Sequence, residues 1–271
     1  MHFETEYFKL VARVLADGYI TKGRNGFTRS LIGTQLQFDV SDYDFPLLNS
    51  RKYSYKGVLG EFAALLRGPK TLEDFIKFGC NYWAKWAEQD LSINVDYGNA
   101  WLDFNGVNQL EWLVNEIKNN PSSRRLVISG WKPDNIINNK LSLPCCHYSY
   151  QFLVRNDELH IVWIQRSADV MIGIPADAVL AATWLIMLAN ECGLPPGTVT
   201  MQFADTHIYE EHIDQAKRLV EVFTEASGYA QPKVTWAIKS QRGSKLVDFI
   251  PTDLEIKYAP YGTPINFLLK E

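Results

Sequence analysis

The sequence is poor in cysteine, and what it lacks narrows the classes of protein to which it can belong. Its four cysteines among 271 residues are too few for a disulfide scaffold, and none stands in a Cys-x-x-Cys pair of the zinc-binding kind. It begins without a signal-like segment and contains no long apolar run. We therefore expect a reduced, cytoplasmic protein with no membrane anchor and no metal.

The charge balance is close to even. There are 27 Lys and Arg against 31 Asp and Glu, for a net charge of −4 and a pI near 5.8, so no general nucleic-acid-binding or membrane-binding surface is indicated. A hydrophobic fraction of 46% is typical of a chain that buries a substantial core. Eight Trp and thirteen Tyr are many, and such residues often line pockets for flat ligands, although core packing is the commoner use of each.

The most informative stretch runs from Leu143 to Gln165. Leu-Pro-Cys-Cys-His leads into a strand-like segment, Asn156-Asp157 has turn chemistry, and an apolar-rich strand returns. Because a hairpin brings its ends together, we expect Arg166 to lie near Cys145 and Cys146, where its guanidinium would favour a nucleophilic thiolate. Taken alone, the two cysteines are better explained as small hydrophobic core residues, which is what most free cysteines are.

Hydrophobic periodicity predicts the other elements. The apolar spacing predicts helices at 3–15, 58–66, 110–118, 175–194 and 210–223, and strands at 31–40 and 126–131. The segment 175–194 is apolar around most of its surface, which predicts a central position. Because the strands and helices do not alternate as βαβ units, we expect an α+β fold.

Six blocks, in order from about Phe8 to about Tyr258, resemble the thymidylate synthase family. They are Glu61 with its apolar helix, Asp-Tyr-Gly-Asn-Ala-Trp at 96–101, Ser-Ser-Arg-Arg at 122–125, Leu-Pro-Cys-Cys-His at 143–147, residues 165–177, and Asp-Thr-His-Ile-Tyr-Glu-Glu-His at 205–212. The resemblance implies one catalytic domain over residues 1–271, with a large mixed β-sheet packed with helices and one sheet face used in a homodimer. It also implies a pyrimidine nucleotide monophosphate as substrate and 5,10-methylenetetrahydrofolate as one-carbon donor.

Carried over position by position, the resemblance assigns roles to single residues. Cys146 is the nucleophile at C6 of the pyrimidine, since a thiolate added there makes C5 nucleophilic; Cys145 stands where the family usually has proline. Glu61 would order water and relay protons, with Tyr97 and Asp205 in the same network. Arg24, Arg166 and Ser167 would bind the phosphate together with Arg124 and Arg125 of a partner subunit, His207 and Tyr209 would hold the sugar, and Trp83, Leu143, Asp169 and Gly173 would bind the folate.

The residues alone leave blander alternatives open. A carboxylate such as Glu61 is costly on an apolar face, but it could instead sit at a helix edge in water. The basic loop at 21–29 could be a solvated turn, and His207 could be a satisfied core residue, although His207 and Tyr209 at i and i+2 share one strand face.

The first departure from the family's pattern is Asp177, which stands where a thymidylate synthase has asparagine. An ionised carboxylate only accepts hydrogen bonds, which suits the N4 amino group of cytosine and opposes O4 of uracil. Aspartate here resembles the deoxycytidylate hydroxymethylases of the same superfamily. The alternative is a protonated Asp177 that imitates asparagine.

Two further departures concern the position beside the nucleotide sugar and the C-terminal segment that closes over the folate. Ala176 replaces a phenylalanine and opens space that could admit a ribose 2′-hydroxyl, as in CMP hydroxymethylases of nucleoside-antibiotic biosynthesis; Lys132, in place of an asparagine, could add a polar contact there. Other side chains could equally fill that space. The chain ends in a charged segment at 266–271 rather than in a short apolar tail that closes over folate, which would let water add to the intermediate.

The resulting hypothesis is a cytidylate hydroxymethylase acting on CMP or dCMP. The alternatives are a reductive methylase of dCMP or dUMP, and a non-catalytic nucleotide- or RNA-binding relative.

Overall fold

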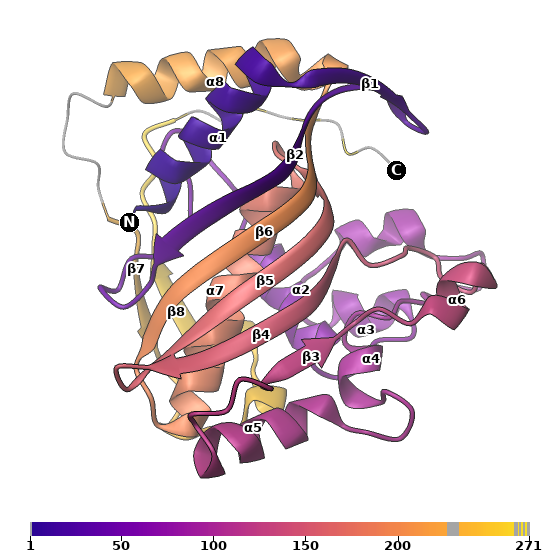
Figure 1. The fold of residues 1–271 in the computed structure, drawn as a ribbon, viewed down its shortest axis with the longest axis vertical. Helices are drawn as coiled ribbons and strands as arrows, with labels where there is room; N and C mark the ends of the chain where they lie inside the picture. Colours follow the sequence, from indigo (N-terminus) through magenta and orange to yellow (C-terminus); the bar gives the residue numbers. More distant parts are fainter. Residues whose placement is uncertain (1, 227–232, 263–264, 266, 268, 270–271) are drawn as a thin grey trace.

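A six-stranded mixed sheet forms the centre of the molecule (Figure 1). The computed structural model describes residues 2–226, 233–262, 265, 267 and 269. The strand order is β1-β2-β6-β5-β4-β3, and only β5 and β6 run parallel. The strands are β1 (Tyr19–Gly23), β2 (Gly26–Asp39), β3 (Val127–Ser129), β4 (His147–Arg155), β5 (Glu158–Asp169) and β6 (Pro196–Tyr209), with β7 (Thr235–Ile238) and β8 (Leu254–Lys257) forming a separate antiparallel pair. The expected α+β class with a large mixed sheet is confirmed.

The helix α7 (Gly173–Cys192) runs behind β5 and β6 and connects them, which is why these two strands are parallel. The other helices are α1 (Phe3–Asp17), α2 (Lys56–Leu65), α3 (Leu72–Ile76), α4 (Asn99–Leu102), α5 (Gln109–Asn119), α6 (Pro133–Ile137) and α8 (Ile213–Ala226), with 3₁₀ turns η1 (Tyr82–Trp86), η2 (Glu210–His212), η3 (Leu246–Asp248) and η4 (Pro251–Asp253). The helix expected at 210–223 therefore begins as η2 and continues as α8. In the view of Figure 1, α7 and α2 lie behind the sheet, α1 and α8 lie toward the top, α5 lies at the bottom, and α3, α4 and α6 lie to the right.

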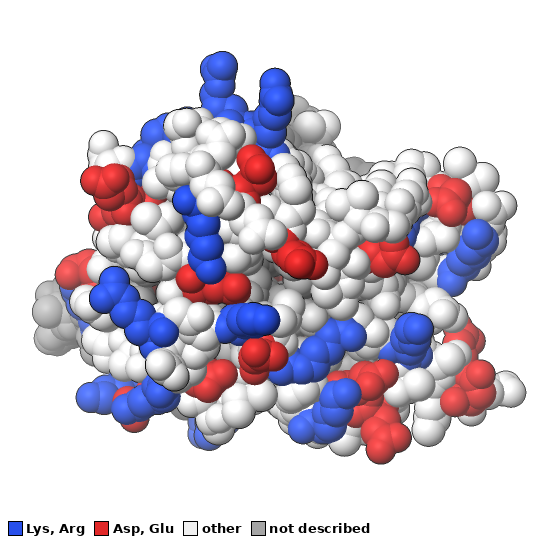
Figure 2. All heavy atoms as spheres, turned by 90° about the horizontal axis from the view of Figure 1, so that it is seen from below, with Lys and Arg blue, Asp and Glu red and all other residues white. Residues whose placement is uncertain are grey.

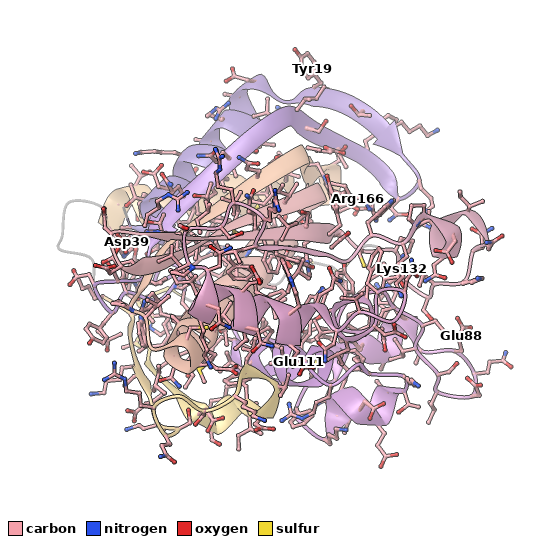
Figure 3. All side chains as sticks on the ribbon, turned by 60° about the horizontal axis from the view of Figure 1, so that its bottom comes forward. Tyr19, Asp39, Glu88, Glu111, Lys132 and Arg166 are labelled. Carbon is pink, nitrogen blue, oxygen red and sulfur yellow. The ribbon has the colours of Figure 1, made fainter. Side chains whose placement is uncertain are left out.

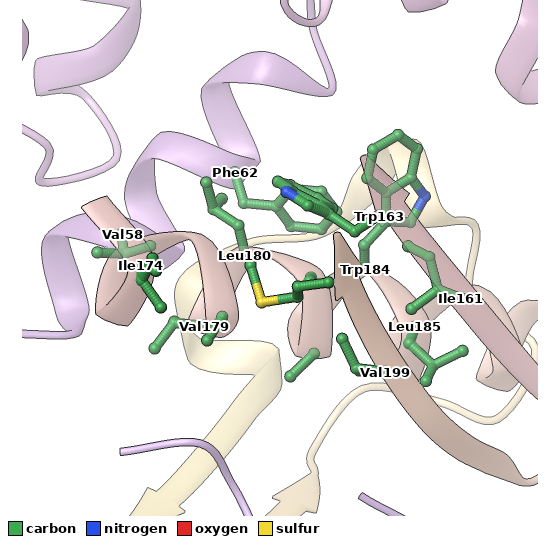
Figure 4. Packing of buried hydrophobic residues seen from close by; sticks show 14 of the residues in the cluster. Val58, Phe62, Ile161, Trp163, Ile174, Val179, Leu180, Trp184, Leu185 and Val199 are labelled. Carbon is green, nitrogen blue, oxygen red and sulfur yellow. The ribbon is translucent and has the colours of Figure 1, made fainter. Parts of the chain in front are cut away.

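The helix α7 is the centre of the hydrophobic core, as its apolar surface predicts. Trp184 packs against Phe62 of α2 at 5.9 Å and against Trp163 of β5 at 6.4 Å between ring centroids (Figure 4). By length and composition alone α7 could cross a membrane, but 83% of its apolar window is buried, as in the core helix of a folded domain. It ends at Gly193, whose φ of 72° is the left-handed conformation that glycine adopts readily at a helix C-terminus.

The β4–β5 hairpin also forms as predicted. Asn156 and Asp157 have φ values of 51° and 62°, and positive φ at both turn residues matches the right-handed twist of the strands that they join. The hairpin brings Gln165, near the end of β5, opposite His147 at the start of β4.

The sheet edge at β3 differs from the expectation. The strand predicted at 126–131 is only three residues long, and the two arginines that precede it, Arg124 and Arg125, lie in an exposed turn. The turn is held locally, because the Arg125 backbone N–H donates to Ser123 Oγ at 3.2 Å and the Arg125 carbonyl accepts from Val127 at 2.8 Å. These local bonds replace ladder bonds, and Arg124 and Arg125 face water.

Candidate active site

Cys146 lies in the loop just before β4, and Arg166 of β5 holds that loop, as the hairpin predicts (Figure 3). The Arg166 backbone N–H donates to the Cys146 carbonyl at 2.9 Å. Its guanidinium donates from Nε to the Cys145 carbonyl at 2.7 Å and from Nη2 to the Pro144 carbonyl at 3.1 Å. Arg166 thereby fixes the backbone that carries the nucleophile.

Arg166 acts on the Cys146 thiol in the expected direction, but burial has the larger effect on its pKa. Burial raises the pKa of Cys146 above its ordinary value, and the charge of Asp177 acts in the same direction. The charge of Arg166 and a hydrogen bond with Tyr97 lower the pKa without overcoming burial. Tyr97 is well placed for this, since its hydroxyl accepts from the Cys146 backbone N–H at 2.6 Å.

Asp177 lies in the first turns of α7 with its side chain 13% exposed, one residue after the partly buried Ala176. Burial raises the pKa of Asp177 to about 8; a hydrogen bond from Gln165 opposes this shift, while the charges of Glu61 and Asp169 reinforce it. The carboxyl therefore carries a proton at neutral pH. The sequence analysis expected an ionised carboxylate and kept a protonated one as the alternative. The raised pKa favours that alternative, because burial could not be known from the sequence.

Gln165 holds Asp177 in a fixed orientation, a contact that the sequence did not reveal. The Trp163 indole N–H, which can only donate, points to Gln165 Oε1 at 3.2 Å. The Gln165 amide nitrogen must then face the other way, and it donates to Asp177 Oδ2 at 2.6 Å and to the Ser167 carbonyl at 3.1 Å. Two sequence signals could have identified Gln165, namely its position near the end of a buried strand and its place at the start of the block at 165–177.

Glu61 is buried on α2, so the alternative that it faces water is wrong. Its two carboxylate oxygens accept from the Tyr82 hydroxyl at 2.5 Å and from the Trp83 indole N–H at 2.7 Å. Burial raises the pKa of Glu61 to about 7, with these two bonds opposing the shift. Trp83, expected to bind folate, is itself buried, stacked on Phe75 at 4.7 Å, and positions Glu61.

His207 and Tyr209 lie together near the end of β6, with ring centroids 5.2 Å apart. Burial raises the pKa of Tyr209, while a hydrogen bond with Asn25 and the charge of Arg24 lower it, so the β1–β2 turn reaches this end of the site. Asp205 approaches His207 Nδ1 at 3.7 Å, but its side chain is 54% exposed. Asp205 therefore lies outside the buried acidic cluster that it was expected to join.

The start of α7 places two of the expected folate ligands beside Asp177. Asp169 Oδ1 accepts from two backbone N–H groups of the following turn, at 2.8 and 3.3 Å. A Cβ built on Gly173 would lie 3.6 Å from Asp169 Cβ and 3.6 Å from Asp177 Oδ2, so Gly173 separates the two carboxyls. Leu143 is partly buried against the core. Hydrogen-bonding carboxyls beside a side-chain-free backbone suit the flat, polar edge of a pterin, so these residues fit a folate.

Lys132 does not lie with Asp177 and Gln165, where it was expected to add a polar contact. It lies directly before α6 (Figure 3), and its ammonium donates to the Asp103 carbonyl at 2.6 Å. Lys132, Asp103 and Asp96 instead line a separate pocket of about 730 Å³.

The arginine pair is also remote from its own nucleophile. Val127 of β3 pairs with Gln151 of β4, and the Arg124 carbonyl accepts from Gln151 Nε2 at 3.1 Å. With a rise of about 3.4 Å per residue, Arg124 and Arg125 lie roughly 20 Å along β4 from Cys146 of the same chain.

A cysteine whose loop is held by an arginine at the mouth of a hairpin, with the carboxyl of Asp177 near it, is an arrangement compatible with a one-carbon transferase. The chain belongs to the thymidylate synthase family, whose sequence profile matches residues 5–267. It is similar to the thymidylate synthase of Mycoplasma genitalium, with 33% identity over 242 residues, covering 78% of this chain and 83% of the relative. The family uses 5,10-methylenetetrahydrofolate as its one-carbon donor.

Proposed function

We propose that this chain is a cytidylate 5-hydroxymethylase, which joins the one-carbon unit of 5,10-methylenetetrahydrofolate and a water to C5 of CMP or dCMP. The proposal rests on a carboxyl at Asp177, held by Gln165 at 2.6 Å, at the position where the family pattern has asparagine. Burial raises the pKa of this carboxyl to about 8. We place the enzyme in the cytoplasm, as its cysteine usage suggests.

A protonated Asp177 complements the N3 and N4 edge of cytosine. Gln165 donates to Oδ2, which suits the carbonyl-type oxygen of the acid, so the proton belongs on Oδ1. The acid can pass this proton to N3, which in cytosine is a lone-pair acceptor. The resulting carboxylate and the N3–H and N4–H donors form a charge-assisted, bidentate pair. Uracil already carries a proton at N3 and cannot form this pair.

Proton transfer to N3 also prepares the ring for Cys146. As the thiolate sulfur bonds to C6, the C5=C6 electron pair moves to C4–C5 and the C4=N3 pair moves to N3, which holds the former Asp177 proton. C5 becomes a nucleophilic enamine carbon, and the folate supplies the electrophilic one-carbon unit. Arg166 and Tyr97 support the thiolate, since both lower the pKa of Cys146.

Glu61 suits the activation of the added water. A pKa of about 7 lets a carboxyl take up and return a proton near neutral pH. The bonds from Tyr82 and Trp83 hold one orientation of the carboxyl. The charged segment at 266–271, which favoured water over hydride in the sequence analysis, includes residues 266, 268, 270 and 271, which lie outside the described residues.

We further propose a homodimer in which the arginines of a second copy complete the phosphate site. Arg24 and Arg166 supply two local guanidiniums, and phosphate recognition favours more. Arg124 and Arg125 are exposed and roughly 20 Å along β4 from their own Cys146, so they do not reach the phosphate site of their own chain. The sheet face turned toward the viewer in Figure 1 is a surface through which two copies could associate.

Reductive methylation of dUMP is the second candidate, favoured by the name of the M. genitalium relative. A neutral carboxyl at Asp177 could donate to O4 and accept from N3–H, as an amide does. The RNA-binding alternative gains nothing from the face seen in Figure 2, where blue and red side chains are interspersed.

The deciding experiment is the product mass from CMP, dCMP and dUMP, each incubated with 5,10-methylenetetrahydrofolate. We expect a gain of one CH₂O unit on a cytosine nucleotide, with tetrahydrofolate as the second product. The faster of CMP and dCMP shows whether the space beside Ala176 accepts a ribose. A gain of one CH₂ unit with dihydrofolate release, or turnover of dUMP alone, contradicts the proposal.

A further inference from the structure

A bulge at the start of β4 brings His147 and Tyr150 onto the same face of the sheet. The register of β4 against β5 shifts by one residue between His147 and Ser149. In a regular strand, residues three apart point to opposite faces. Here both rings lie against Trp163, at 4.3 Å for His147 and 4.8 Å for Tyr150 between centroids.

The contacts between His147 and Tyr150 determine which ring nitrogen carries the proton. The Tyr150 hydroxyl lies 2.6 Å from His147 Nδ1 and donates to the His147 carbonyl at 3.1 Å. A hydroxyl has one proton and a carbonyl can only accept, so both contacts are satisfied only if Nδ1–H donates to the Tyr150 oxygen. The opposite tautomer would leave two acceptor oxygens face to face.

No bulk water relieves that conflict at this depth. His147 is 5% exposed and Tyr150 is 0% exposed, and an unsatisfied buried polar contact is costly. Burial lowers the pKa of His147 to about 3, so the ring is neutral and carries a single N–H. With that proton on Nδ1, Nε2 is a bare acceptor.

Nε2 of His147 faces Asp177 Oδ1 at 3.9 Å. We infer that Tyr150 is a positioning residue which, through His147, presents Asp177 to the substrate base as a proton donor. A bare Nε2 offers no N–H to Asp177. The other tautomer, with its proton on Nε2, would donate toward the carboxylate and stabilise its ionised form. The consequence for the base rests on the proposed function, but the tautomer itself does not.

The other groups that face Asp177 do not replace this control. They are Glu61 of α2, Asp169 and Gln165 of β5, Cys146 before β4, Tyr97 before α4, and Tyr53 before α2. None of these six is cationic, and Gln165 donates to Oδ2 rather than to Oδ1. On the Oδ1 side, the group that approaches Asp177 is the imidazole of His147, with Nε2 at 3.9 Å.

The tautomer can be read without any substrate. In the full-length protein with ¹⁵N-labelled histidine, long-range nitrogen–proton correlations show which ring nitrogen of His147 is protonated, with the ring assigned through its own backbone. We expect a protonated Nδ1 and a bare Nε2. Protonation at Nε2 in the wild type would overturn the inference whatever the enzyme's substrate, and this measurement needs no variant to fold.

The consequence is tested with Tyr150→Phe and the matched control Tyr148→Phe, which removes a neighbouring β4 hydroxyl whose ring packs on Trp131 at 5.9 Å. In Tyr150→Phe the imidazole is free to donate to Asp177, so the decline of kcat/KM with CMP at high pH should begin about one pH unit lower than in the wild type. Tyr148→Phe should keep the wild-type profile.

The outcomes separate the two proposals. A folded Tyr150→Phe variant with an unshifted pH profile and an unchanged His147 tautomer refutes the role of Tyr150. A wild-type enzyme with the expected tautomer that turns over dUMP alone refutes the proposed function and leaves the tautomer standing.

Discussion

Replacing Asp177 with asparagine tests proton transfer by this side chain, because the substitution keeps its size and shape but removes the acidic proton. The largely buried carboxyl is protonated, so an amide of nearly the same size keeps a donor and an acceptor in its place. Gln165 fixes the acceptor side, because its amide donates to Oδ2 at 2.6 Å and is itself oriented by Trp163. What asparagine cannot do is give up a proton to N3 of cytosine.

The expected loss is therefore in turnover rather than in binding. A general acid contributes about 10²–10⁴-fold, or roughly 2.7–5.5 kcal/mol of barrier lowering. For Asp177→Asn we expect kcat with CMP to fall within this range, KM to change by less than about tenfold, and dUMP turnover to rise relative to CMP. Steady-state kinetics with both nucleotides measure this. A variant whose kcat with CMP stays within about tenfold of wild type would refute the acid role.

The pH profile gives a second readout of the same change. Wild-type kcat/KM with CMP should decline as pH rises through about 8, where free Asp177 loses its proton, and this decline should be absent in Asp177→Asn.

The free energy of unfolding of the wild type should also decrease as pH rises. The folded pKa of about 8 exceeds the unfolded value of about 3.9, so the folded state holds a proton that the unfolded state releases between these values, and stability falls with rising pH. In denaturant unfolding, the stability of Asp177→Asn relative to the wild type should increase as the pH is raised toward 8.

Three further substitutions test the remaining roles. Cys146→Ala should abolish turnover of all three nucleotides while the protein stays folded by circular dichroism; retained turnover would exclude the covalent mechanism. Glu61→Gln should slow formation of the hydroxymethyl product by about 100-fold in rapid-quench assays with nucleotide affinity nearly unchanged, and an unchanged rate would remove Glu61 from the proton relay. Mixing inactive Cys146→Ala with a variant lacking Arg124 and Arg125 should restore about a quarter of wild-type activity, because half of randomly formed dimers carry one complete site. A mixture that stays inactive would show that the arginines do not cross.

The parts of the fold that depend on local pattern could be predicted from the sequence. The apolar run around Trp184 predicted the central helix α7, and Asn156-Asp157 predicted the turn of the β4–β5 hairpin; both are present in the structure. The hairpin in turn fixed Arg166 beside Cys146, since the ends of paired strands must meet. These inferences needed only periodicity and turn chemistry.

The parts that depend on surroundings could not be predicted. The proton on Asp177 follows from how deeply α2 and β5 enclose it, and the direction of the Lys132 ammonium follows from a carbonyl at Asp103. The bulge before Tyr150 leaves no turn residue as a signal, because it is set by the pairing of β4 with β5. Such features arise from tertiary packing.

The acidity of Asp177 is set by burial and by neighbouring carboxyls rather than by a cation. Burial raises the pKa of Asp177, and the charges of Glu61 and Asp169 raise it further. Ionising both Asp177 and Glu61 would leave two like charges in one poorly solvated region. A base that arrives with a proton-accepting N3 relieves this conflict, because the proton leaves Asp177 only as a cationic partner forms against it. A base that arrives with N3–H does not. Discrimination between cytosine and uracil therefore depends on where the proton rests before the substrate binds as much as on the shape of the pocket.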